Sequence, residues 1–403
     1  MFDVLTAAAV ADELREEILD GRIQRIGLVD STTVAAEVYA RGRRRALIAS
    51  ADPQRARLLL AASMPSLDPA LITPFMLQAR KYLRGGILVG IDQPPLERVV
   101  RLSIAKRLPP HNATRSRRRA ATAPDIEGDE EEDDTDSLAI YGDVEVIRLD
   151  LAVEIMGRHS NIILVDADGL IMESIKRVTP KMSRVRPVLP RRPYTLPPPL
   201  DRPDPRRLTS AGAEALLASA KQSEALAQVL VRGLRGVSPP LGREIAFRVG
   251  GDAAVRAGDL SLENAGTLAR TIRELFEPLV TNAWAPHLYL HDGAVVDYAA
   301  IPMRHLAVDA EEIALDSISA GIARAENAAG DDGTAAQGRH DHAQRRTRLV
   351  EAVRRERDKA EQRLRSMREQ RARAEAADRY RKWGELIFAY LWQIEPGQTE
   401  LAV

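Results

Sequence analysis

The sequence predicts an α+β protein built from a β-rich N-terminal domain, a helical domain and a long C-terminal helix. Short runs of alternating apolar residues fill most of the first 200 residues, which is the period of half-buried strands. A helical pattern replaces them after a proline-rich stretch at 197–205, whose composition is that of a stiff linker. From 344 to 393 apolar residues recur at the spacing of a thin coiled-coil seam. The expected boundaries are 1–200 for the β-rich domain, 201–283 for the helical domain, 284–343 for a small β element and linker, and 344–403 for the long helix.

The β-rich domain opens with an amphipathic helix at 3–20. A second helix begins at Pro74, and its basic residues Arg80, Lys81 and Arg84 cluster on one side. Strands are expected at 23–26, 34–39, 46–50, 58–61, 87–91 and 99–104. Residues 105–137 are a charged insertion, with nine acids between Asp125 and Asp136. Because blocks of like charge seldom pack, this insertion is expected to be a disordered loop.

The stretch 146–194 holds the most specific pattern in the chain. A strand at 147–155 is followed by a polar break, a buried strand at 162–165, a hairpin turn at 166–169 and a returning strand at 170–175. The break contains Arg158, His159, Ser160 and Asn161. The basic and polar side chains there can bind phosphate, although His159 also fits a structural donor. After the hairpin, seven Lys or Arg and no acid lie between 174 and 193, among them Lys176, Arg177 and Arg186. This basic tail is either a phosphate-binding edge or a solvated face.

The second half of the chain is helical. Residues 226–234 and a helix starting near Leu241 flank a Gly-Val-Ser-Pro-Pro turn, which is the shape of a helix-hairpin-helix. Backbone amides at the start of such a second helix can bind phosphate, but many helical hairpins use the same residues. The long helix ends near 393, Pro396-Gly397 turns the chain, and a strand is expected from Gln398. Because a long helix needs a returning partner, the sequence is expected to be a fragment or a short form.

Composition limits the class of partner. The formal net charge is zero, yet residues 345–382 hold 15 Lys or Arg against seven acids, which favours RNA over a protein coiled-coil partner. The absence of cysteine excludes disulfides and thiolate metal sites. The sequence has no apolar span of 18 residues and no signal pattern, so a soluble cytoplasmic protein without a membrane partner is expected.

Several stretches together resemble the NFACT family of ribosome quality-control factors. The stretches are Phe2-Asp3 with Gly21-Arg22-Ile23, PFMLQARKYLRGG, Glu97-Arg98-Val99, EIMGRHSNIILVD, GVSPPL and RYRKWGELIFAYLWQIEPGQ. The resemblance covers most of the chain, with gaps at 105–140 and 309–343. It implies an RNA-binding factor that binds a 50S ribosomal subunit still blocked by peptidyl-tRNA. It also implies recruitment of tRNA, with tRNA-Ala expected, for C-terminal tailing of the stalled chain.

The same resemblance implies no enzyme activity, no cofactor and no DNA partner, because peptide-bond chemistry stays in the ribosome. The family's functional Asp-Arg pair falls on Glu97 and Arg98, and its early aspartate falls on Asp3. We expect Arg80, Lys81, Arg158 and the other basic and polar residues named above to join them in binding tRNA. Purely structural roles stay open as alternatives: Asp3 as a helix N-cap, and Glu97-Arg98 as a solvated turn or an ion pair. Glu97 for aspartate, Tyr82 for histidine, the charged insertion and the missing second coil and C-terminal RNA-binding domain depart from the family pattern.

Three other functions are alternatives to this one. The N-terminal fold is also similar to that of formamidopyrimidine-DNA glycosylases, but Phe2 stands where they carry a nucleophilic proline and the zinc-binding cysteines are absent, so this activity is rejected. A fibronectin-binding adhesin, as some relatives have been labelled, lacks a signal or anchor here. A generic RNA-binding coiled-coil scaffold is the third.

Overall fold

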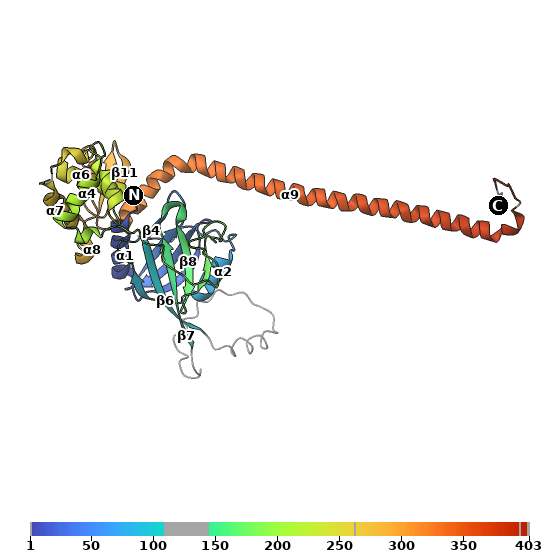
Figure 1. The fold of residues 1–403 in the computed structure, drawn as a ribbon. Helices are drawn as coiled ribbons and strands as arrows, with labels where there is room; N and C mark the ends of the chain where they lie inside the picture. Colours follow the sequence, from blue (N-terminus) through green and yellow to red (C-terminus); the bar gives the residue numbers. More distant parts are fainter. Residues whose placement is uncertain (1, 109–144, 262, 395, 401–403) are drawn as a thin grey trace, which may run out of the picture. The chain divides into compact units, whose positions relative to one another are not determined.

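The computed structural model describes residues 2–108, 145–261, 263–394 and 396–400 (Figure 1). It divides into two compact units, Met1–Ala328 and Ala329–Val403. The first unit holds a large sheet, a group of helices and a small sheet. The second holds most of the long C-terminal helix. The predicted α+β class with a large antiparallel sheet is confirmed.

The large sheet has nine antiparallel strands in the order β4-β3-β2-β1-β5-β6-β7-β8-β9. Their bounds are β1 Arg22–Leu28, β2 Thr33–Ala40, β3 Arg43–Ser50, β4 Arg57–Ala61, β5 Ile87–Asp92, β6 Val99–Leu108, β7 Glu145–Glu154, β8 Asn161–Asp166 and β9 Ile171–Ser174. The chain therefore starts in mid-sheet, steps to one edge, returns through a helix to β5 and steps to the other edge. All nine strands fall where the sequence predicts them. Strand β6 continues to Leu108, so the predicted insertion starts too early at 105, and its remaining residues 109–137 lie outside the described part.

The inner face of the sheet carries the main core. Helix α1 (Val4–Ile18) lies on it and buries Val10, Leu14 and Ile18, as the amphipathic pattern predicts. Strand β3 approaches β8, so the sheet curls, and helix α2 (Pro74–Tyr82) contacts both β1 and β9. The curl gives the large sheet an enclosed apolar interior, which stabilises it without a second sheet packed against it.

The outer face is covered only in part by the residues that the structure describes. A second cluster forms where the segment after β9 folds back over β7–β9, with Ala152, Ile163, Val165, Ile171 and Val188 buried together. Val178 and Val188 pair in a short bridge, and so do Leu170 and Pro193. The basic tail is therefore a folded cover for one part of the sheet.

The helical part and a small sheet complete the first unit. Its helices are α4 Ser210–Ser219, α5 Leu226–Gly233, α6 Pro239–Gly250, α7 Asn264–Phe276 and α8 Pro278–Thr281, and its strands are β10 His287–His291, β11 Ala294–Ala299 and β12 Glu311–Ala314. Strand β12 and the start of helix α9 (Ile318–Ala389) occupy residues that the sequence predicts as linker, so that prediction is wrong. The Ser319 hydroxyl accepts a hydrogen bond from the amide of Leu60 on edge strand β4 at 2.9 Å, which ties the first turn of α9 to the sheet.

The second unit consists of the continuing α9, the 3-10 turn Leu391–Gln393 and a turn at Pro396-Gly397. The predicted strand from Gln398 is not formed at 398–400, and 401–403 lie outside the described residues. Within the part of the chain that the structure describes, no helix is both long and apolar enough to span a membrane.

Candidate functional site

A cleft forms where three distant segments of the first unit meet. They are the start of α1, the turn before β6 and the turn that joins α5 to α6. The cavity has a volume of about 460 Å³, and its lining includes Asp3, Glu97, Arg98, Arg235 and Ser238. The three residues that the family resemblance singles out are therefore neighbours, although 94 residues of sequence separate Asp3 from Glu97.

Asp3 holds two helix ends together. Its Oδ1 accepts a hydrogen bond from the Thr6 amide at 2.9 Å, which makes it the N-cap of α1. Its Oδ2 accepts from the Ser238 hydroxyl at 3.0 Å. Ser238 is itself the N-cap of α6 and accepts from the Leu241 amide at 3.3 Å. Asp3 is thus an N-cap, as one alternative held, and it also links α1 to the helical hairpin.

Glu97 makes the second link to the hairpin. The Arg235 guanidinium donates to Glu97 Oε1 at 2.6 Å and to the Pro95 carbonyl at 3.3 Å. The two side chains are 29% and 17% exposed, so the ion pair is partly shielded from water. Next to Arg235, Gly236 has φ of +75°, and a Cβ there would lie 3.3 Å from Val4. Only glycine meets both demands without strain. The ion-pair alternative for Glu97 therefore holds, and its partner belongs to the helical hairpin.

Arg98 also lines the cleft, but within the described part of the chain no such bond joins its side chain to the hairpin. Its carbonyl accepts from the Ile155 amide at 2.8 Å, which fixes its backbone against the end of β7. Among the described residues its half-buried guanidinium takes part in no ion pair. An arginine held by its backbone with an unengaged guanidinium suits recognition of a phosphate or a guanine edge.

The polar break after β7 lies at the same end of the sheet, because β6 starts where β7 ends. It forms the 3-10 turn Gly157–His159, with Arg158 and His159 exposed and Arg158 Nε 3.0 Å from His159 Nε2. Ser160 and Asn161 are buried instead, since Ser160 Oγ accepts from the Met156 amide and Asn161 bonds both backbone groups of Lys176. Their side chains hold the loop, and their assignment as phosphate ligands stays a prediction.

The basic tail also differs from the expected open edge. Arg186 is paired with the buried Glu154, whose carboxylate also accepts from the Tyr194 hydroxyl at 2.9 Å. Arg177 pairs with Glu173 on the surface. The Lys176 amine is shielded from solvent without a hydrogen-bond partner, and burial lowers its pKa although Asp52 opposes the shift. These three residues have contacts within the fold, and their assignment as RNA ligands stays a prediction.

Arg80 and Lys81 are exposed but far from the cleft. They lie at the end of α2, where Lys106 Nζ on β6 donates to the Lys81 carbonyl at 2.5 Å. Burial and the nearby Arg84 lower the pKa of Lys106. Because strand β6 rises about 3.4 Å per residue, this end is roughly 24 Å from the cleft. The predicted tRNA residues therefore fall on two separate surfaces.

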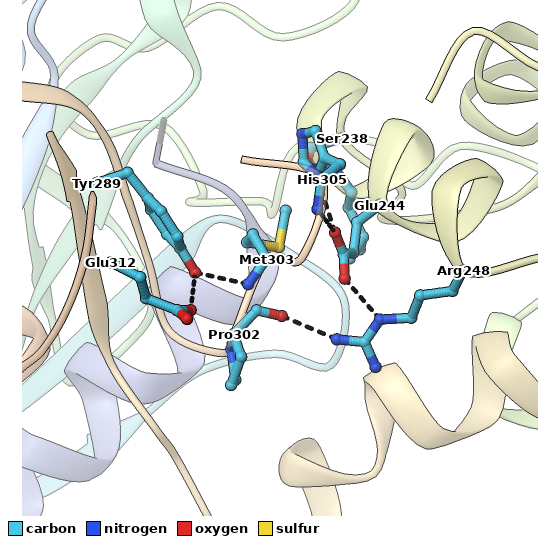
Figure 2. A network of polar contacts seen from close by, with 9 residues as sticks. Ser238, Glu244, Arg248, Tyr289, Pro302, Met303, His305 and Glu312 are labelled. Atoms are coloured by element: carbon cyan, nitrogen blue, oxygen red, sulfur yellow. Dashed lines mark hydrogen bonds and ion pairs between the residues drawn. The ribbon is translucent and has the colours of Figure 1, made fainter. Parts of the chain in front are cut away.

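A buried network holds the second helix of the hairpin against the small sheet (Figure 2). Glu244 on α6 accepts from the His305 amide at 3.0 Å, from its ring at 2.8 Å and from Arg248 at 2.5 Å. Arg248 also donates to the Pro302 carbonyl at 2.8 Å, and the Tyr289 hydroxyl joins Met303 to Glu312. Burial opposes ionisation of Glu244, but these donors lower its pKa to about 2. The network fixes α6, and with it Ser238.

The sequence analysis missed Arg235, Ser238 and this network. Ser238 carries a local signal, since a serine followed by two prolines is a typical N-cap. Arg235 carries none, because its partner Glu97 lies 138 positions earlier in the sequence.

The fold and cleft can be compared with known proteins. A family model described as NFACT N-terminal and middle domains matches residues 3–403. The Rqc2 homolog RqcH of Bacillus subtilis (strain 168) is 27% identical over 403 residues, all of this chain and 61% of that protein. The Rqc2 homolog RqcH of Streptococcus suis (strain 05ZYH33) is 24% identical over 401 residues, 99% of this chain and 60% of that protein. The chain thus spans about three fifths of the length of these curated relatives.

Two solved structures share the fold. The N-terminal part of the fibronectin/fibrinogen-binding protein from Streptococcus suis superposes with a TM-score of 0.56 at 22% identity, over 80% of this chain and 97% of that chain. The fibrinogen binding protein from Staphylococcus aureus gives 0.57 at 22% identity, over 79% and 97%. At this identity the likeness concerns the fold alone. Because the family model covers nearly the whole chain, this protein belongs to the NFACT family.

Proposed function

We propose that this chain acts in ribosome quality control, as the name of its RqcH relatives implies. In this role it binds a 50S subunit that carries peptidyl-tRNA and recruits tRNA, with tRNA-Ala as the expected species, for C-terminal tailing of the stalled chain. The observation that carries the proposal is the convergence of Asp3, Glu97 and Arg98 in one cleft between the sheet and the α5–α6 hairpin.

Each part of the cleft has a separate task in this proposal. Asp3 and Glu97 hold the hairpin in place through Ser238 and Arg235. Arg98 then meets a phosphate or base edge of the tRNA, with Arg158 and His159 beside it. The turn before α6 acts as a helix-hairpin-helix, whose amides at 239–241 face a phosphate. Helix α9 supplies the first arm of a coiled coil that reaches across the subunit.

The proposed factor is not an enzyme. It binds and positions RNA in the cytoplasm and leaves peptide-bond formation to the ribosome, so it needs no cofactor. Among the described residues no group of His, Asp and Glu has the arrangement of a metal site. An adhesin function draws only on the names of proteins that share the fold at 22% identity.

RNA co-purification tests the proposal. The protein and an Arg98→Ala variant are isolated from cells and the bound RNA is sequenced, with Arg270→Ala, an exposed arginine of α7, as the matched control. We expect enrichment of tRNA-Ala and large-subunit rRNA, loss of the tRNA alone in the Arg98 variant, and no change in the control. If neither RNA rises above background, the chain has the fold without this function.

A further inference from the structure

The outer face of the large sheet is exposed over one part that neither the basic tail nor the loop before α2 covers. Further along β1 and β2 that loop covers the same face, since Leu67 lies against Gly27 and Ala35 is buried. The exposed part comprises the start of β1, the end of β2, the start of β5 and the first half of β7. Large apolar side chains are exposed there: Tyr39 at 45%, Ile87 at 39%, Val89 at 46% and Val146 at 56%. Large apolar side chains gathered on an exposed sheet face mark an interaction surface.

The strand register places arginines among these apolar side chains. Directly paired residues point to the same face of an antiparallel sheet. Arg44 pairs with Tyr39, Tyr39 with Arg22, Arg22 with Ile87, Ile87 with Ala105, and Ala105 with Arg148. The row thus reads Arg, Tyr, Arg, Ile, Ala, Arg across six adjacent strands. The sequence neighbours Ile23 and Val38 are buried, which confirms that the row itself faces outward.

The charges of this row are not neutralised within the described structure. Arg22, Arg44 and Arg148 are exposed and take part in no ion pair among the described residues. The nearest acids on the same face, Glu37 and Asp150, lie two residues inward on their strands and are half-buried, and Asp150 accepts from the Ser103 hydroxyl at 2.6 Å. Five strand spacings of about 4.8 Å make the row roughly 24 Å long. Cations at this spacing, with an aromatic ring between them, fit a polyanion whose charges are distributed along a surface.

We propose that this row, Arg44, Tyr39, Arg22, Ile87 and Arg148, is a docking surface for the phosphate backbone of an RNA helix. It is distinct from the cleft at Arg98, since the cleft opens at the start of β6 and the row crosses that strand at Ala105. The surface follows from register and exposure alone, and the choice of RNA as the polyanion rests on the proposed function. Arginines would contact successive phosphates, and Tyr39 with Ile87 would pack on the sugar surface of the shallow minor groove.

A salt titration with a defined probe tests the surface. The probe is a blunt 20-base-pair RNA duplex, and the variant is Arg22→Gln with Arg44→Gln and Arg148→Gln. The matched control carries three substitutions at exposed arginines elsewhere, Arg192→Gln, Arg256→Gln and Arg270→Gln. Losing three phosphate contacts should weaken duplex binding at least about tenfold near 0.1 M salt and reduce the slope of log K against log salt by about 2 to 3. Tyr39→Ala should weaken binding without changing the slope, because the ring carries no charge.

The outcomes separate this surface from the cleft. We expect the row variant to weaken tRNA and duplex alike, and Arg98→Ala to remove only the preference for tRNA. If tRNA preference is absent in the unmodified protein but the row variant still loses duplex binding, the proposed function fails and the surface stands. The surface is refuted if the row variant binds the duplex like the control. It is also refuted if the variant loses binding only to phosphatidylserine vesicles, because the polyanion is then a membrane.

Discussion

The link between Glu97 and Arg235 makes the sharpest test of how the cleft is built. In the structure one charged hydrogen bond of 2.6 Å joins two partly shielded side chains, one before strand β6 of the large sheet and one after helix α5. A hydrogen bond to a charged group contributes about 1.5–3 kcal/mol, and the exposed part of the pair is screened. We therefore expect Arg235→Ala or Glu97→Gln to lower the free energy of unfolding by about 2 kcal/mol, with a coupling energy of about 1–2 kcal/mol in the double-mutant cycle.

The same cycle, measured as tRNA affinity, separates positioning from contact. If Glu97 acts by holding the hairpin, each single variant should weaken tRNA binding about 5- to 30-fold, the double variant should be no weaker, and the reversed pair Glu97→Arg with Arg235→Glu should recover part of the affinity. Arg232→Ala is the matched control, because its ion pair with Glu224 lies within the helical part and does not connect it to the large sheet. Additive losses, or a Glu97→Gln variant that loses tRNA without losing stability, would show that Glu97 contacts the RNA itself.

Three further perturbations follow from single contacts. Donors hold the pKa of Glu244 near 2 against 4.5, a difference of about 3 kcal/mol, so this stabilisation should be present above pH 4.5, fall as pH drops toward 2, and vanish in Glu244→Gln, as urea unfolding at several pH values would show. Ser319→Ala leaves the buried Leu60 amide without its acceptor, which should cost about 1–3 kcal/mol and speed hydrogen exchange at that amide. Asp3→Ala removes a helix cap and the contact with Ser238, so a loss above about 1 kcal/mol is expected in thermal unfolding, whereas Asp3→Asn should keep most of the cap.

Local patterns account for the elements that the sequence predicts well. Most strands of the large sheet carry their own alternation, β8 is a short apolar run, and α1 carries its own apolar face, so nine strands and the first helix follow from neighbours in sequence. The start of α9 does not. Its first turns are rich in Ala, Gly and Asp, and they are held by partners far away: Ser319 by Leu60 and Glu13, and Glu326 by Arg57 at 3.0 Å. A helix stabilised in this way leaves no periodic signal in its own sequence.

Residue type alone does not show whether a polar side chain is already engaged. Arg186 and Arg98 look equivalent in the sequence. Arg186 is paired with Glu154, 32 positions earlier, whereas the Arg98 guanidinium takes part in no ion pair among the described residues. The family resemblance indicated Glu97 and Asp3, but only the structure gives their partners, because Arg235 and Ser238 are distant in the sequence and approach from the helical hairpin. The outer row of arginines and apolar residues could not be predicted from the sequence for a related reason. Its members are scattered over residues 22–148 and become neighbours only through strand register.

Two carboxylates in a cleft proposed to receive phosphate would repel it if they were unengaged. Here Asp3 accepts from the Thr6 amide and the Ser238 hydroxyl, and Glu97 is paired with Arg235, so both carboxylates are engaged before any ligand arrives. Two further cations line the cleft: Arg98, and Arg202, which donates to the Val231 carbonyl. This arrangement also accounts for glutamate where the family has aspartate: the requirement is to reach Arg235, and a long, flexible arginine tolerates one extra methylene in its partner. A carboxylate that bound a ligand atom directly would not have that freedom.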